Sequence, residues 1–108
     1  MSKREKHTIL LLQISENRGS RTYYDYPTVT AAMNGICSIF EQKLREHTKN
    51  RNVEYDTEDI NYFLENITDI SCLVLDFKTN QYSPRSRNWI KERLKKHLIN
   101  ISRRNEKY

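Results

Sequence analysis

Residues 7–14 read HTILLLQI, and this stretch indicates the fold class more clearly than any other part of the chain. Its Ile, Leu and Thr content is typical of a β-strand. A strand with one solvated face alternates apolar and polar residues, whereas this one is apolar on both faces. One face, made of Thr8, Leu10, Leu12 and Ile14, is the more continuously apolar and is predicted to pack against the chain's own helices. The other face has an apolar centre and a polar rim, which is the layout of an interface.

Three later segments of the chain are predicted to complete the sheet. Residues 21–26, RTYYDY, follow a polar turn and predict a second strand that forms a hairpin with the first. Residues 72–77 predict a third strand, and a short fourth strand is expected around Tyr82.

Three amphipathic helices are expected from apolar residues that recur every three or four positions. The first covers 29–47, with Gly35 as a point of close packing against the sheet, and a polar loop follows at 49–52. The second begins near Thr57, which is expected to be its N-cap, and the third is opened by Pro84 and Ser86. The sequence therefore predicts an α+β fold in the order ββααββα, a four-stranded antiparallel sheet with three helices on one face.

The second face of the sheet then needs a cover, because three helices cannot cover both faces. A second copy of the chain is the simplest candidate, so this face is predicted to form a homodimer. The interface residues expected from the first and third strands are His7, Ile9, Leu11, Gln13, Cys72 and Val74.

The chain has 108 residues, enough for one domain, which we expect to span residues 7–102 with flexible charged tails at 1–6 and 103–108. Its longest apolar run, four residues from Ile9 to Leu12, is far too short to cross a bilayer, and no signal peptide is evident. We expect no membrane association.

Catalytic and metal-binding residues are not expected, and neither is a cofactor. The three histidines lie on different predicted elements, and the two cysteines, Cys37 and Cys72, fall within apolar patterns that disfavour a thiolate. Asp56, Glu58 and Asp59 are better explained by helix capping than by acid–base chemistry. The two glycines form no phosphate-binding loop. An enzyme is therefore not predicted.

The formal net charge of +5 is concentrated at one end of the chain. Residues 85–108 hold nine Lys or Arg and two Glu, a net +7, whereas residues 1–84 hold ten and twelve, a net −2. This basic helix could contact a nucleic-acid backbone weakly through Arg87, Lys91, Lys95 and Lys96. No aromatic-rich RNA-binding strand accompanies it, so direct nucleic-acid binding is the alternative reading and a solvated helix face the preferred one.

Several collinear segments resemble the enhancer of rudimentary family over roughly residues 7–98. They are His7 to Leu11, Arg21 to Tyr26, Gly35-Ile36-Cys37, Tyr55-Asp56, Asp69 to Val74 and Trp89-Ile90-Lys91-Glu92. The chain departs from the family pattern at its basic N-terminus, at Leu75, where Tyr is frequent, and at Lys95-Lys96-His97. It therefore resembles a diverged paralogue.

The resemblance implies a small α+β domain that forms a homodimer through its sheet and has no enzyme activity. It implies an adaptor or scaffold that binds short segments of partners in RNA processing, gene silencing or small-RNA biogenesis, with links to transcription and the cell cycle. The expected location is the nucleus and the cytoplasm. The family is also discussed as a target of casein kinase II. Thr22 keeps the acidic residue three positions on, Asp25, that this kinase prefers, whereas Thr28 has Ala31 there. Thr22 is therefore the candidate phosphosite.

Overall fold

The computed structural model describes residues 6–48 and 55–106, so the polar loop predicted at 49–52 lies outside the described residues. These described residues form four strands and three α-helices, with one short 3-10 helix, η1, before the second strand. In chain order they are β1 (Thr8–Gln13), η1 (Arg18–Ser20), β2 (Arg21–Tyr26), α1 (Val29–Thr48), α2 (Thr57–Asn66), β3 (Asp69–Asp76), β4 (Gln81–Arg85) and α3 (Arg87–Glu106).

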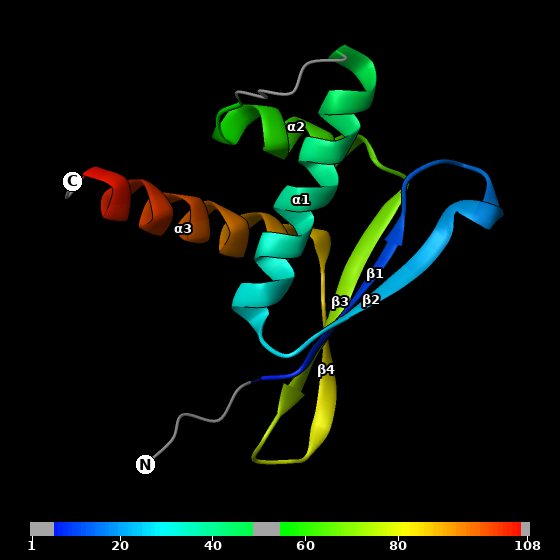
Figure 1. The fold of residues 1–108 in the computed structure, drawn as a ribbon. Helices are drawn as coiled ribbons and strands as arrows, with labels where there is room; N and C mark the ends of the chain where they lie inside the picture. The colour runs from blue at the N-terminus through cyan, green and yellow to red at the C-terminus, as the bar shows by residue number, and fades with distance from the viewer. Residues whose placement is uncertain (1–5, 49–54, 107–108) are drawn as a thin grey trace.

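The four strands form one antiparallel sheet in the order β2-β1-β3-β4 (Figure 1). The most apolar strands, β1 and β3, are central, where both of their edges are hydrogen-bonded. The predicted α+β fold and its ββααββα order are therefore confirmed.

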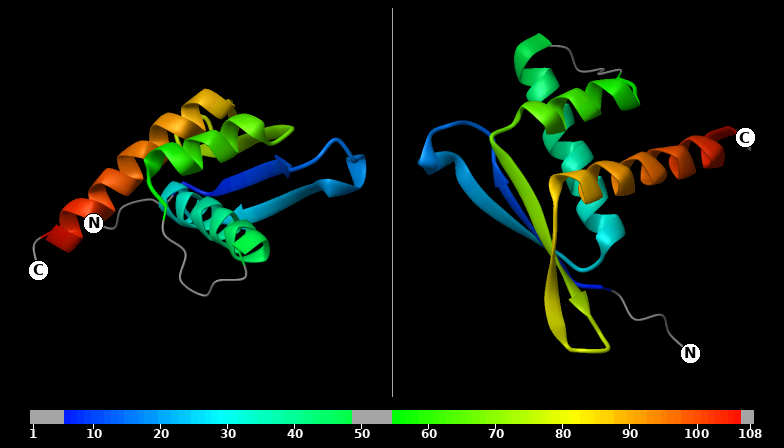
Figure 2. Two further views of the ribbon diagram at one scale, coloured as in Figure 1. Left: turned by 90° about the horizontal axis from the view of Figure 1, so that it is seen from above. Right: turned by 180° about the vertical axis from the view of Figure 1, so that it is seen from behind.

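All three helices lie on the same side of the sheet, as both Figure 1 and the view from behind in Figure 2 show. The core fills the space between them and the inward residues of the two central strands. Its members are more than nine-tenths buried and include Leu10, Leu12, Ile70, Cys72 and Val74 from the sheet, with Met33, Ile36, Ile60, Leu64, Ile90 and Leu94 from the helices. In the described part of the chain, no helix lies against the opposite face of the sheet.

Gly35 lies where α1 packs against the Tyr26 side chain at the end of β2. A Cβ atom built on Gly35 would stand 2.1 Å from the Tyr26 hydroxyl oxygen, a distance that two unbonded atoms do not reach. The predicted close packing at Gly35 is confirmed. It explains why a helix tolerates a residue that costs about 1 kcal/mol relative to Ala.

The helix starts differ in part from the prediction. The N-cap of α2 is Asp56 rather than Thr57, and Asp56 and Asp59 form a reciprocal capping box. The backbone N–H groups of Asp56 and Asp59 each thereby gain a carboxylate acceptor. Helix capping therefore explains the acidic residues at this helix start without catalysis. At α3, Ser86 Oγ accepts a hydrogen bond from the Trp89 N–H at 3.3 Å, as a helix cap does. Pro84 belongs to β4 instead of opening the helix.

The third helix continues to Glu106, so the domain boundary predicted at residue 102 falls inside α3. The flexibility of the segments 1–6 and 103–108 stays a prediction. Among the helices of the described residues, none is both long and apolar enough to cross a membrane.

Candidate functional site

The uncovered side of the sheet, called here the open face, is the first candidate site. Its members follow from the strand register, because residues directly opposite each other point to the same side. They are Ile9, Leu11 and Gln13 from β1, Arg21, Tyr23 and Asp25 from β2, Asp69, Ser71, Leu73 and Leu75 from β3, and Tyr82 and Pro84 from β4. Leu11 is 39% exposed and Tyr23 is 70% exposed. The centre of this face is apolar, and its two ends carry the polar residues.

Two of the predicted interface residues do not lie there. Cys72 is opposite Leu10 and Val74 is opposite Thr8, so both point to the helix side, where they are 1% and 6% exposed. The prediction that Cys72 and Val74 belong to the open face is wrong. The third strand presents Ser71, Leu73 and Leu75 instead.

The signal that separates the two sets was present in the sequence. Ile70, Cys72 and Val74 form an unbroken apolar set at alternate positions, whereas the other set of β3 begins with Asp69 and Ser71. The rule that places the more continuous set inside gave the right answer for β1 and gives it for β3 as well.

Gln13 lies at one end of the open face yet is only 8% exposed. Its side-chain oxygen accepts a hydrogen bond from Arg21 Nε at 3.0 Å, and its amide nitrogen donates to the Ser15 carbonyl at 2.9 Å. The amide is therefore satisfied within the chain, and it fixes the end of the β1–β2 hairpin.

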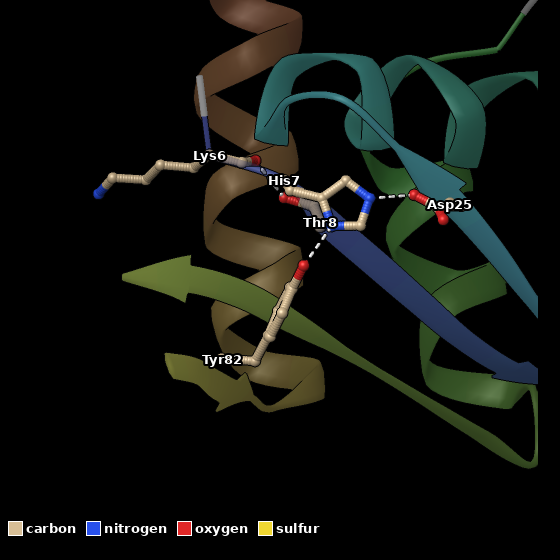
Figure 3. Close-up of polar contacts among 5 residues, drawn as sticks. All are labelled: Lys6, His7, Thr8, Asp25 and Tyr82. Carbon is tan, nitrogen blue, oxygen red and sulfur yellow. Dashed lines mark hydrogen bonds and ion pairs between the residues drawn. The ribbon is translucent and has the colours of Figure 1, made fainter. Parts of the chain in front are cut away.

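His7 lies at the opposite end, just before β1, and connects three strands (Figure 3). Its Nδ1 shares a hydrogen bond of 2.6 Å with the hydroxyl of Tyr82 on β4, and its Nε2 pairs with the carboxylate of Asp25 on β2. A neutral ring can donate to Asp25 and accept from Tyr82, and a protonated ring can donate to both. The His7 side chain therefore links β2 to β4 at the polar end of the open face.

A groove between α1 and α2, called here the α1–α2 groove, is a second candidate site that sequence reasoning missed. Its volume is about 560 Å³, and its lining is mostly aromatic and aliphatic. The residues that line it include Ile14, Phe40, Leu44, Tyr55, Tyr62, Phe63 and Ile67, with Lys43, His47 and Asp59 among its polar members. Tyr62, at 72% exposed, was the available signal, because an exposed aromatic side chain on an amphipathic helix suits recognition better than packing.

The floor of the α1–α2 groove is held by packed rings and one polar cluster. Phe40 contacts Tyr55 and Phe63 with ring centroids 4.9 and 5.1 Å apart. The Tyr55 hydroxyl donates to a Glu41 carboxylate oxygen at 2.8 Å, and burial together with this bond raises the pKa of Tyr55. Burial likewise raises the pKa of the Cys37 thiol. A raised pKa keeps the Tyr55 hydroxyl and the Cys37 thiol protonated at neutral pH.

Comparison with known proteins identifies the family of this chain. The family model described as "Enhancer of rudimentary" matches residues 4–104. The chain belongs to the enhancer of rudimentary family. An enhancer of rudimentary homolog from Arabidopsis thaliana is 42% identical over 98 residues, 90% of each chain. The Dictyostelium discoideum homolog is 38% identical over 97 residues, covering 89% of this chain and 97% of the homolog. The protein enhancer of rudimentary of Drosophila virilis is 40% identical over 89 residues, covering 82% of this chain and 86% of that protein.

In this enhancer of rudimentary family member, half of the predicted nucleic-acid contacts serve helix packing. Arg87 donates hydrogen bonds to the carbonyl oxygens of Ile67 at 3.1 Å and Thr68 at 3.0 Å, just past the end of α2. Lys91 forms an ion pair with Glu65, and this contact lowers the pKa of the Glu65 carboxyl. Both cations therefore connect α3 to the end of α2.

The other two predicted contacts, Lys95 and Lys96, are exposed but lie on different sides of α3. Lys95 lines a groove of about 400 Å³ between α2 and α3. Lys96 lines a smaller depression beside α1, together with Arg93 and His97. The structure therefore does not gather the four cations into one strip along α3.

Thr22 is exposed on β2, opposite Leu12, and its side of the strand is the one that faces the helices. Its phosphorylation stays a prediction. Within the described residues, no group of three or more His, Cys, Asp or Glu side chains is placed to hold a metal ion.

Proposed function

We propose that this enhancer of rudimentary family member is a noncatalytic homodimeric adaptor that pairs through the open face. It would bind short segments of partner proteins in RNA-processing, gene-silencing or small-RNA biogenesis pathways, in the nucleus and the cytoplasm. The observation that carries the proposal is the uncovered apolar centre of the open face, where Ile9, Leu11 and Leu73 lie side by side on paired strands.

The argument for a second copy rests on the chemistry of the open face. A sheet face with apolar residues on its central strands is stabilised when another apolar surface excludes water from it. Two-fold pairing places the same apolar centre of each copy against the other, with the polar ends at the rim. A stable dimer of this kind would bury on the order of 1,200–2,000 Å² in total.

The argument for partner segments rests on the α1–α2 groove, which lies on the helix side and stays accessible when the open face is covered. A largely apolar lining with a few polar groups is the usual composition of a recognition site. A homodimer would carry two such grooves, so that one adaptor brings two copies of a partner together.

Affinity capture followed by mass spectrometry tests the adaptor role. We expect Tyr62→Lys to lose proteins that the wild-type chain captures, because it adds a charge at the apolar groove. The matched control is Asn61→Lys, the same new charge on the same helix, which lies in the groove between α2 and α3. Equal capture by the wild-type, Tyr62→Lys and Asn61→Lys chains would exclude the α1–α2 groove as the binding site.

Direct nucleic-acid binding through α3 is the alternative function, and the packing roles of Arg87 and Lys91 count against it. A salt titration with single-stranded RNA separates the two functions, since each phosphate contact adds a slope of about 0.7 to the dependence of log affinity on log salt. The adaptor function predicts weak binding with no sequence preference. Tight, sequence-dependent binding would favour the alternative.

A further inference from the structure

The two outer strands of the sheet, β2 and β4, differ in how their free edges are built. An edge strand presents unpaired backbone N–H and C=O groups, which can pair with another chain. Proteins therefore usually protect such edges with proline, lysine, bulges or short strands. The backbone hydrogen bonds show which groups each edge presents.

One bond fixes the pattern for the whole sheet. The Leu75 N–H donates to the His7 carbonyl at 2.9 Å, so His7, the residue just before β1, bonds toward β3. Backbone direction alternates along an antiparallel strand, so the even-numbered residues of β1 bond toward β2. In the observed register these even positions are opposite Thr22, Tyr24 and Tyr26. The N–H and C=O groups of Arg21, Tyr23 and Asp25 consequently point away from the sheet.

The same alternation of backbone direction applies to β4, the strand at the other edge. There the outward positions are Tyr82 and Pro84, because Cys72, Val74 and Asp76 of β3 bond to the residues opposite them. Proline has no N–H to donate, and a proline at an outward position is a known protection of an edge strand. The outer edge of β4 therefore offers one backbone donor, that of Tyr82.

Within the described residues, the β2 edge is protected by neither a proline nor a lysine, and its charged residues Arg21 and Asp25 are of opposite sign. Its residues from Arg21 to Asp25 are all exposed. Tyrosine and threonine favour the strand conformation, so the edge stays extended without a partner. On the side of β2 that faces the helices, the rings of Tyr24 and Tyr26 stack with centroids 6.4 Å apart.

We propose that the β2 edge accepts an extended segment of a partner protein as a fifth, antiparallel strand. The inference rests on the proposed adaptor role but not on dimer formation, since the added strand is held by the backbone groups of the β2 edge. The segment would form hydrogen bonds with the outward N–H and C=O groups of Arg21, Tyr23 and Asp25, as in other complexes formed by strand addition.

The side chains of β2 specify the chemistry of this segment. An antiparallel partner runs in the direction opposite to β2. From its N-terminal end it therefore meets, on the open-face side, first Asp25, then Tyr23 and then Arg21. An antiparallel partner that is basic opposite Asp25, apolar opposite Tyr23 and acidic opposite Arg21 gives favourable cross-strand pairs. The expected pattern is basic-x-apolar-x-acidic, with β-branched residues at the two intervening positions. A parallel partner would need the reverse order of charges.

A nuclear magnetic resonance titration of the isotope-labelled full chain tests the proposal. The probe is the peptide acetyl-Thr-Lys-Thr-Val-Thr-Glu-Thr-amide, and the control is the same peptide with its central valine N-methylated. We expect the peptide to slow hydrogen exchange at the Tyr23 and Asp25 amides by tenfold or more, and the N-methylated control to have no effect. No protection of these amides at millimolar peptide, or equal protection by both peptides, would overturn the proposal.

A pair of variants at Tyr23 separates the backbone from the side chain. Tyr23→Pro removes an outward N–H that no strand uses, whereas Tyr23→Val keeps it. Peptide affinity should fall at least tenfold in the first and stay within a few-fold in the second. Equal loss in both would overturn the strand-addition mode. If Tyr23→Pro fails to fold, the N-methylated peptide decides the question. The two proposals can fail separately. If Tyr62→Lys loses captured partners while the peptide has no effect at β2, the adaptor role is supported and strand addition at β2 is refuted.

Discussion

Gly35 shows how one contact decides which residue a helix can tolerate. Replacing it by Ala should improve helix propensity by about 1 kcal/mol, but the new methyl group would collide with the Tyr26 ring. We expect the collision to dominate, so that Gly35→Ala lowers the free energy of unfolding by about 1–3 kcal/mol. Urea denaturation measures the change.

A double-mutant cycle identifies the cause. In a Tyr26→Ala background the space above residue 35 is empty, and Gly35→Ala should become stabilising. If Gly35→Ala stabilises the chain while Tyr26 is present, the described packing between α1 and β2 is wrong.

Cys72 connects burial to the alkaline limit of stability. Burial raises the pKa of its thiol to about 11, whereas the unfolded thiol ionises near pH 8.5. The folded state therefore holds its proton more tightly. The resulting stability is complete below about pH 8.5 and is lost as the pH rises toward 11, by up to roughly 3 kcal/mol. Thermal unfolding of the wild-type and Cys72→Ala chains between these pH values should show a smaller alkaline loss in the variant. Parallel curves would contradict the assignment.

At the scale of elements, the capping box explains where α2 begins. Asp56→Ala should cost about 1 kcal/mol, because the Asp59 N–H loses its acceptor, while Asp56→Asn should retain most of the stability. The change is measurable in urea as a shift of the midpoint at constant slope. Equal stability of the two variants would mean that the box does not hold the helix start.

Periodicity predicts the three helices and the two central strands, because each buries one continuous apolar set, whereas the exposed outer strands are indicated by composition and turn residues. The helix cores at Ile36, Ile60 and Ile90 and the strand from Arg21 to Tyr26 were evident from composition and spacing. The start of β3 at Asp69 was missed because its first residues alternate with polar ones. The local pattern around Pro84 predicts a helix start, because the tolerance of β4 for a proline at an outward edge position depends on the strand register, which no local pattern encodes.

The candidate sites were predictable only in part, for a related reason. Ile9 and Leu11 could be placed on the open face from β1 alone, since alternation fixes the faces of one strand. The correct partners on β3 require the register between strands far apart in sequence. The α1–α2 groove requires the packing of two helices that meet only in the folded chain.

For the whole molecule, the account depends on the open face being an interface between two copies of the chain. Leu11 lies at the centre of that face, and its neighbour Leu12 is 5% exposed in the chain's own core. Arginine at Leu11 would place two unpaired charges in a two-fold interface, at a cost of several kcal/mol each. A micromolar dimer, worth about 8 kcal/mol, would not survive this cost.

The most direct test is therefore the molar mass of Leu11→Arg, measured by size-exclusion chromatography with light scattering beside circular dichroism. The wild-type chain should elute as a dimer, Leu11→Arg as a folded monomer, and Leu12→Arg as a misfolded product. A Leu11→Arg chain that remains a dimer with unchanged stability would contradict the account, as would a wild-type chain that is monomeric.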